Sequence, residues 1–248
     1  MTLSERAASG FVTDTGIDVP AVTTDEMREL DRIAMEETGP NLFQMMENAG
    51  RTLAQLAIEV LGSSWQTAKI VVLAGAGGNG GGGICAARHL ANRRAQVVLV
   101  LSDPDHLGDV PVFQRKIFRE THGREVEAAR LAEERADLIV DALIGYGLHT
   151  APRGTAADLI RWGNGTGTPI LALDVPSGVD ATIGETPGEA IRPRWTITLA
   201  LPKTGLLRAS TGDLFLADIG IPECAYRRVV RAYIPPFGDR YRVPLARR

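Results

Sequence analysis

Six short apolar runs recur along the chain from residue 69 onward. Runs of this length that are apolar throughout are typical of strands buried on both faces of a sheet. The sequence therefore predicts six buried strands, in the runs KIVVLAG (69–75), QVVLVLS (96–102), DLIVDALI (137–144), PILALDV (169–175), WTITLAL (195–201) and DLFLADIG (213–220).

Longer segments of mixed polarity separate the first five runs. Residues 81–93 carry Ile84, Ala87 and Leu90 at a spacing that places them on one face of a helix, and residues 110–121 show a similar pattern. Strands that alternate with helices predict an α/β fold with a parallel, doubly wound sheet and right-handed crossovers. Only a short segment separates the last two runs, which we expect to close one edge of the sheet in antiparallel fashion.

Two amphipathic helices are predicted ahead of the first strand. Thr24 opens the first helix, and Asp25 and Glu26 lie in its first turn, where the helix dipole favours acidic side chains. Gly-Pro at 39–40 separates it from a second helix over residues 42–60, in which apolar residues recur every three or four positions.

The pattern indicates a single domain that spans residues 23–233. Residues 1–22 show no sustained periodicity and are mixed in Ser, Thr, Gly and Pro, which predicts a flexible N-terminal arm. Residues 234–248 are polar and contain Pro, and we expect them to form a C-terminal tail outside the domain.

Composition and charge narrow the class of protein. The 248 residues are 44% hydrophobic and carry a net charge of −3, which is typical of a soluble globular protein and offers no clustered basic surface for nucleic acid. No run approaches the roughly 20 apolar residues that cross a bilayer, and the N-terminus lacks the apolar core of a signal peptide. We therefore expect a cytoplasmic protein without nucleic-acid or membrane partners, with Cys85 and Cys224 as free thiols.

Glycine is concentrated between residues 75 and 83, directly after the first predicted strand. Such a loop exposes backbone N–H groups, and the helix that follows adds the positive end of its dipole, so the segment is suited to binding phosphate. Gly75, Gly77 and Gly80 also fit G-x-G-x-x-G, with Asp103 placed to bind a ribose, which makes a nicotinamide-dependent dehydrogenase an alternative. A tight turn that binds no ligand is the other alternative interpretation of the glycines.

Two carboxylates stand at the ends of neighbouring predicted strands, Asp141 in the run 137–144 and Asp174 in the run 169–175. Ligands of open α/β sheets bind beyond the carboxyl ends of the strands. A single aspartate at such a place often only caps a turn. Two that face a glycine loop favour a functional site, in which burial raises a carboxyl pKa or a bound cation keeps both ionised.

Several longer blocks occur together and in order between Thr24 and Pro222: MMENAG (45–50), the glycine run, DALIG (141–145), DVPSGVD (174–180), ALPKTGL (200–206) and ADIGIP (217–222). In this combination the sequence resembles the NAD(P)H-hydrate epimerases, the YjeF N-terminal-domain family. The resemblance implies a Rossmann-like three-layer αβα sandwich, a bound potassium ion (K⁺), and repair of damaged nicotinamide cofactor by interconversion of the R and S forms of NAD(P)HX. Bifunctional relatives carry a second, kinase-like domain, which we do not expect in this chain.

The resemblance also implies roles for particular residues. Asp174 matches the family's substrate-contacting aspartate and is our choice for catalysis. Asn79, Asp141 and Ser177 are the implied ligands of K⁺, an ion that takes oxygen ligands. The glycine loop would line the nucleotide, and the loop that begins at Gly145 would hold phosphate. Besides Asp174, the implied substrate-binding residues are Gly78, Asn79, Gly80, Gly81, Gly82, Gly145, Tyr146, Gly147, Leu148, His149, Thr150 and Ala151.

The chain departs from the usual family pattern inside these loops. Gly78 and Gly82 stand where Asn and Asp are usual, and Tyr146 and Thr150 stand where Thr and Arg are usual. A catalytically impaired nucleotide-binding or scaffold protein of the same fold is therefore an alternative. The dehydrogenase alternative lacks a Tyr-x-x-x-Lys pair. The implied partner is the small molecule NAD(P)HX, while a homodimer, the preference between NADHX and NADPHX, and a role for Lys203 stay open.

Overall fold

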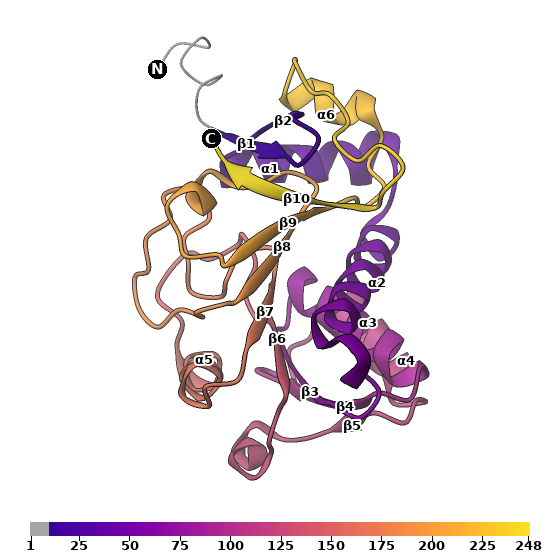
Figure 1. Ribbon diagram of the computed structural model, residues 1–248, viewed down its shortest axis with the longest axis vertical. Coiled ribbons are helices and arrows are strands. Elements are labelled where there is room, and N and C mark those ends of the chain that lie inside the picture. The colour runs from indigo at the N-terminus through magenta and orange to yellow at the C-terminus, as the bar shows by residue number, and fades with distance from the viewer. Residues whose placement is uncertain (1–9) are drawn as a thin grey trace.

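The computed structural model of the protein describes residues 10–248 (Figure 1). All six apolar runs form strands, as predicted, and four further strands are present. The strands of this part of the chain are β1 (Gly10–Thr13), β2 (Asp18–Pro20), β3 (Lys69–Ala74), β4 (Gln96–Leu101), β5 (Arg124–Glu125), β6 (Leu138–Ala142), β7 (Ile170–Leu173), β8 (Trp195–Leu199), β9 (Asp213–Ala217) and β10 (Arg242–Arg247).

The ten strands form one sheet in the order β2-β1-β10-β9-β8-β7-β6-β3-β4-β5. All neighbours from β9 to β5 are parallel, which confirms the parallel sheet. The antiparallel pairing expected between β8 and β9 is wrong, because the segment between them contains the 3₁₀ turn η5 (Thr204–Leu207) and returns the chain to the same end of the sheet. The antiparallel pairs are instead β9–β10, β10–β1 and β1–β2.

Both ends of the described chain belong to this sheet. Residues 1–9 of the expected N-terminal arm lie outside the described residues, but the rest of that segment forms β1 and β2. β10, which comes from the expected tail, lies between β1 and β9. Phe11, Val19 and Val243 are buried because each of these strands turns apolar side chains toward the core. The flexible arm is therefore wrong for residues 10–20, and residues 242–247 are part of the fold.

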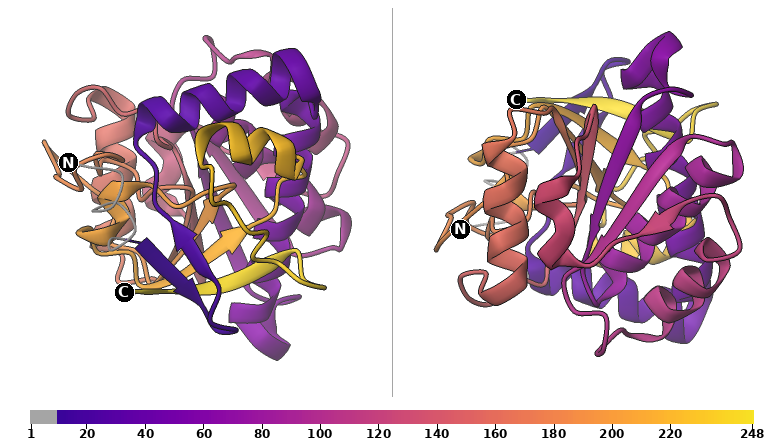
Figure 2. Two further views of the ribbon diagram at one scale, coloured as in Figure 1. Left: turned by 90° about the horizontal axis from the view of Figure 1, so that it is seen from above. Right: turned by 90° about the horizontal axis from the view of Figure 1, so that it is seen from below.

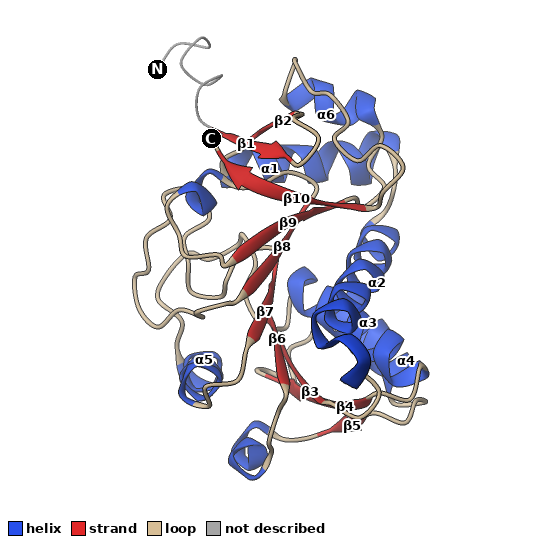
Figure 3. Cartoon of the chain, in the orientation of Figure 1, coloured by secondary structure: helices blue, strands red, loops and turns tan. Residues whose placement is uncertain are grey.

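Helices cover both faces of the sheet, so the fold is the expected three-layer αβα sandwich (Figure 3). Ile70, Val72 and Ala74 of β3 pack toward α2, α3 and α4, while Val71 and Leu73 pack toward α5 and η4. The helical elements of the described chain are α1 (Thr24–Ile33), η2 (Ala34–Thr38), α2 (Leu42–Leu61), η3 (Gly62–Ser64), α3 (Gly78–Asn92), α4 (Asp109–Phe118), η4 (Ala128–Glu133), α5 (Gly154–Gly165), η5 and α6 (Glu223–Val229).

The two N-terminal helices begin where the sequence predicts, and their caps explain why. Thr23 caps α1: its hydroxyl accepts a hydrogen bond from the Glu26 N–H, and the Glu26 carboxylate accepts one from the Thr23 N–H. Asn41 and Gln44 form the same reciprocal pair at α2. α1 lies beside α6 at the antiparallel end of the sheet (Figure 2). Among residues 10–248, none of the helices combines the length and hydropathy that a membrane span requires.

Candidate active site

The candidate residues meet at the carboxyl ends of the neighbouring parallel strands β3, β6 and β7. β3 leads into the glycine run and the first turn of α3. Asp141 lies near the end of β6, and Asp174 follows β7 directly. The adjacent ends of β3, β6 and β7 therefore bring together the three segments that the sequence singled out.

Most glycines of the run are required by close packing. A Cβ on Gly75 would lie 1.9 Å from the Leu143 carbonyl oxygen, and one on Gly80 would lie 1.8 Å from the Gly75 carbonyl oxygen. A Cβ on Gly83 would lie 2.3 Å from the Ala142 Cβ. The start of α3 thus fits against β3 and β6 only without side chains.

Four glycines at the start of α3 are predicted to bind substrate, and among them only Gly78 has open space where a Cβ would be. Gly80, Gly81 and Gly82 are buried, and Cβ atoms on the last two would meet Val110 and Leu173. A phosphate that approaches this helix can therefore reach Gly78 and the backbone before it, while Gly80 to Gly82 shape the loop from behind.

Asp141 joins the loops that follow β6 and β7. The Ser177 N–H and hydroxyl donate hydrogen bonds to its two carboxylate oxygens, at 2.8 and 2.6 Å, and the Leu143 N–H donates a third at 3.2 Å. Burial raises the pKa of Asp141 to about 6, although the hydrogen bonds from Ser177 and Leu143 oppose that shift. Asp141 is fully buried and has only neutral donors in these bonds, so a cation nearby would compensate its charge.

Asn79 carries two buried polar atoms without a partner. Neither its amide nitrogen nor its amide oxygen makes a hydrogen bond to any described residue, although both are shielded from solvent. The side chain lies beside the loop after β6, since a Cβ on Gly145 would be 3.2 Å from the Asn79 Cγ and 3.0 Å from the Asp174 Oδ2. Unpaired buried polar atoms are uncommon in folded proteins and point to a ligand.

Asp174 is held in a backbone conformation that L-residues rarely adopt, with φ of 68°. Asp174 is buried, and its carboxylate accepts a hydrogen bond from the Lys203 ammonium, which also donates to the Leu199 carbonyl at 3.0 Å. The Tyr146 N–H donates to the other carboxylate oxygen at 3.2 Å. The turn after β7 therefore fixes a carboxylate inside the site, paired with a buried lysine.

Lys203 is the residue whose role the sequence left open, and the structure places it in the site. It follows β8, the strand next to β7, and the segment around it pairs with the chain just before α1, where the Val22 N–H donates to the Pro202 carbonyl at 2.9 Å. A lysine in the loop that follows a buried strand of a parallel sheet is the signal that would have found it.

The loop after β6 extends from the site to the surface. Gly145 lies against Asp174 and Asn79, whereas Gly147, His149 and Thr150 are exposed. Leu148 and Ala151 are half-buried. The inner part of this loop therefore contacts the candidate catalytic residue, and the outer part is accessible to a phosphate.

Residues 42–205 match the protein family described as YjeF-related protein N-terminus, and this segment contains the glycine run, both aspartates and Lys203. The chain belongs to this family. The YjeF-type fold is also seen in the crystal structure of yeast ynu0, which superposes with a TM-score of 0.80 at 22% identity over 91% of this chain and 100% of the yeast one.

Curated proteins are similar along most of the chain. An NAD(P)H-hydrate epimerase of Dehalogenimonas lykanthroporepellens is 50% identical over 236 residues, which cover 95% of this chain and 96% of the relative. An NAD(P)H-hydrate epimerase of Weissella koreensis is 35% identical over 207 residues, 81% and 91% of the two chains. The bifunctional NAD(P)H-hydrate repair enzyme Nnr of Moorella thermoacetica is 35% identical, but the match covers only 41% of that enzyme.

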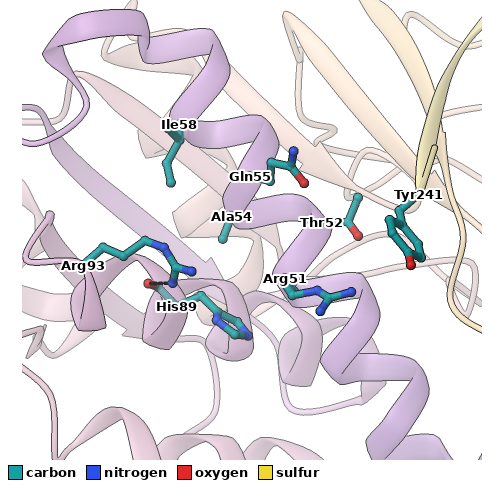
Figure 4. A pocket seen from close by; sticks show the side chains of 8 residues that line it. All are labelled: Arg51, Thr52, Ala54, Gln55, Ile58, His89, Arg93 and Tyr241. Atoms are coloured by element: carbon teal, nitrogen blue, oxygen red, sulfur yellow. Dashed lines mark hydrogen bonds between the residues drawn. The ribbon is translucent and has the colours of Figure 1, made fainter. Parts of the chain in front are cut away.

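A cavity of about 400 Å³ lies elsewhere on this YjeF-type domain (Figure 4). Its side chains come from α2, the last turns of α3 and the segment before β10. Because His89 lies in the last turn of α3 and Arg93 directly follows that helix, at the end farthest from the glycine run, the cavity is separate from the candidate active site. The lining residues are Arg51, Thr52, Ala54, Gln55, Ile58, His89, Arg93 and Tyr241.

Glu47, Cys85 and His89 form a group between α2 and α3 whose ligand atoms lie within 4.8 Å of one another. Both oxygens of Glu47 accept hydrogen bonds from the Arg88 guanidinium at 2.6 Å, so a cation of the protein itself neutralises this carboxylate. Burial raises the pKa of Cys85 to about 12 and keeps it a thiol. The group therefore stabilises helix packing, and Cys85 and Cys224 are free as predicted.

Proposed function

We propose that this chain is an NAD(P)H-hydrate epimerase, which interconverts the R and S forms of NADHX and NADPHX. The observation that carries the proposal is the buried pair of Asp174 and Lys203 beside the glycine run, in a chain that is 50% identical to a curated epimerase over 95% of its length. The pair combines a negative charge with a donor of protons, and the reaction needs both.

Inversion of the hydrate requires the C–O bond next to the ring nitrogen to break and to form again on the other face. The nitrogen lone pair expels the hydroxyl, which leaves as water once it has taken a proton. We assign that proton to the hydrogen-bonded pair of Lys203 and Asp174. The carboxylate stabilises the ring cation that remains, and when water adds to the opposite face, the pair takes the proton back.

We propose that K⁺ binds near Asn79, Asp141 and Ser177. The residues fit the ion, because the buried amide oxygen of Asn79 has no partner among the described residues and the fully buried Asp141 has only neutral donors in its hydrogen bonds. The ion would supply positive charge that fixes the loops after β3, β6 and β7. Asp141 and Ser177 hold the last two of these loops together through their own hydrogen bonds.

We place the phosphates of the substrate at the start of α3 and along the loop from Gly145 to Ala151. Gly78 leaves room for an anion at the N-terminus of a 15-residue helix, where the dipole favours negative charge. This loop follows β6 and therefore lies at the same edge of the sheet as the start of α3, which follows β3. Tyr146, near the base of this loop, contacts Asp174 and so connects phosphate binding to the reacting carbon.

The scaffold alternative rests on Gly78 and Gly82, where the family usually has Asn and Asp. A Cβ on Gly82 would lie 2.9 Å from the Leu173 Cδ2 and 3.7 Å from the Met46 Sδ, so a side chain there would enter the interface between α2, α3 and β7. A carboxylate at that place would not reach the open face of the loop. Its absence therefore removes no substrate contact, which supports the enzyme over the scaffold.

A direct experiment separates the alternatives. The purified S and R hydrates are each incubated with the protein, and the other epimer is followed by chromatography. The epimerase predicts that both reach the same final ratio, and Asp174→Asn slows the approach by roughly 10²–10⁴-fold while hydrate binding persists. A scaffold binds the hydrate without converting it, and a dehydrogenase leaves it unchanged and transfers hydride instead.

A further inference from the structure

Tyr146 contacts three charged side chains at once. Its backbone N–H donates a hydrogen bond to Asp174, and its ring lies 5.6 Å from the Lys203 ammonium, within the range of a cation–π interaction. Its hydroxyl donates to the Asp31 carboxylate of α1 at 2.5 Å. One residue therefore connects the Asp174–Lys203 pair with the N-terminal helix.

Asp31 lies outside residues 42–205, the segment that matches the family. It stands on α1, a helix fixed by its buried residues Met27, Leu30 and Ile33. Burial raises the pKa of Asp31, and the hydrogen bond from Tyr146 partly opposes that shift. A half-buried carboxylate on a firmly packed helix is a suitable anchor for a flexible loop.

The loop needs an anchor because glycines flank Tyr146 on both sides. Gly147 has open space around it, and Gly145 contacts Asp174 and Asn79 only through its backbone. Without a fixed point, such a segment samples many backbone conformations. The hydrogen bond from the Tyr146 hydroxyl to the Asp31 carboxylate supplies that fixed point at the far end of the tyrosine side chain.

We propose that Asp31 is a positioning residue of the epimerase, which acts on the Asp174–Lys203 pair through Tyr146. By accepting the hydrogen bond from the Tyr146 hydroxyl, Asp31 keeps the tyrosine ring against the Lys203 ammonium. It also keeps the Tyr146 N–H in its hydrogen bond to the Asp174 carboxylate. The ring also excludes water from the ion pair, which strengthens its electrostatic effect on the substrate. The inference rests on the proposed function, since it assigns a role within that reaction.

A double-mutant cycle tests the proposal. Tyr146→Phe keeps the ring and backbone but loses the hydroxyl, and Asp31→Ala loses the acceptor. We expect each to lower kcat by roughly 10–10²-fold with little change in KM, because the pair is displaced while phosphate binding is kept. The double variant should be no slower than the slower single one. Asp31→Asn, which retains an acceptor oxygen, should recover most of the activity.

Three outcomes overturn the proposal. Multiplicative losses in the double variant mean that Asp31 acts independently of Tyr146. An Asp31→Asn variant as slow as Asp31→Ala means that its charge acts on the substrate directly. Unchanged kcat with a lower melting temperature means that the contact is only structural. Glu29→Ala, at an exposed carboxylate on the same helix that pairs with Arg32, is the matched control and should leave kcat unchanged.

A readout without substrate separates this proposal from the proposed function. Burial and then the negative charge of Asp31 raise the pKa of Tyr146, with a smaller contribution of the same sign from Asp174 and an opposing one from Arg28. In an alkaline titration followed by NMR of ¹³Cζ-labelled tyrosine, Asp31→Ala should lower the Tyr146 pKa, and Glu29→Ala should not. If that shift appears in a protein that does not epimerise, the proposed function fails but the anchor stands. If it does not appear, the anchor is wrong.

Discussion

At the residue scale, the buried ion pair of Asp174 and Lys203 contributes to stability and, in the proposed mechanism, carries the chemistry. The Lys203 and Asp174 side chains are 1% and 5% exposed, so each charge has lost most of its water and depends on the other. The hydrogen bonds from the Tyr146 N–H to Asp174 and from Lys203 to the Leu199 carbonyl hold the two groups in place. Neither partner can be removed without leaving a buried charge alone.

We therefore expect Lys203→Met to lower the free energy of unfolding by roughly 3–5 kcal/mol, because Asp174 then stays buried without a counter-charge. Unfolding in urea measures the loss. The double variant Asp174→Asn with Lys203→Met should regain much of the stability and none of the activity. A single variant as stable as the wild type, or a double variant that epimerises, contradicts the role of the pair.

Substitution should be nearly neutral at one of the two unusual glycines and destabilising at the other. Gly78→Asn places its side chain in open space, so we expect a change in unfolding free energy within about 0.5 kcal/mol. Gly82→Asp forces a carboxylate against Leu173 and Met46, and we expect a loss of roughly 2–5 kcal/mol from overpacking and an unpaired buried group. Thermal unfolding of both variants checks this, and equal stabilities would show that Gly82 does not face the core.

At the element scale, the sequence predicted the strands that are apolar throughout and the helices between them, but not the ends of the sheet. β3, β6 and β7 are apolar throughout because both of their faces are covered. β1, β2 and β10 alternate buried with more exposed residues, so they leave no continuous apolar run to detect, and only pairing with β9 and with one another fixes them. The direction of β9 was also missed, because it depends on how residues 200–212 cross the sheet.

Contacts between helices predict a pH dependence of stability. Burial opposes ionisation of Glu47, but the hydrogen bond and charge of Arg88, with a further hydrogen bond from His89, outweigh it and lower the pKa of Glu47 to about 2. A carboxyl whose pKa is lower in the folded state stabilises the fold above its unfolded pKa of 4.5, and this contribution is lost as the pH falls from there toward 2.

Glu47→Gln should accordingly cost about 1 kcal/mol at neutral pH, a modest value because the Glu47 side chain is 43% exposed. The cost should disappear as the pH falls through this range. Unfolding in urea at a series of pH values measures it, with Glu133→Gln, at a surface pair with Arg130, as the matched control. A cost that stays constant with pH would mean that Glu47 acts through packing and not through its charge.

At the scale of the whole molecule, a parallel sheet brings distant segments to one edge. The positions of Asp141 and Asp174 at that edge followed from the ends of their strands, and the resemblance to the family implied their roles. The partner of Asp174 did not follow, because Lys203 reaches it only through the path of the chain after β8. Asp31 was not foreseen either, since it lies on a helix whose amphipathic pattern indicates only packing.

The measurement that tests the central claim most directly is epimerisation in water enriched in ¹⁸O, starting from one purified hydrate. If the Asp174–Lys203 pair promotes loss of the hydroxyl as water and addition of water to the other face, mass spectrometry will find ¹⁸O in the inverted product. Asp174→Asn will slow inversion and label uptake together. Inverted product without label, or no inversion by a folded protein that binds the hydrate, would contradict the account.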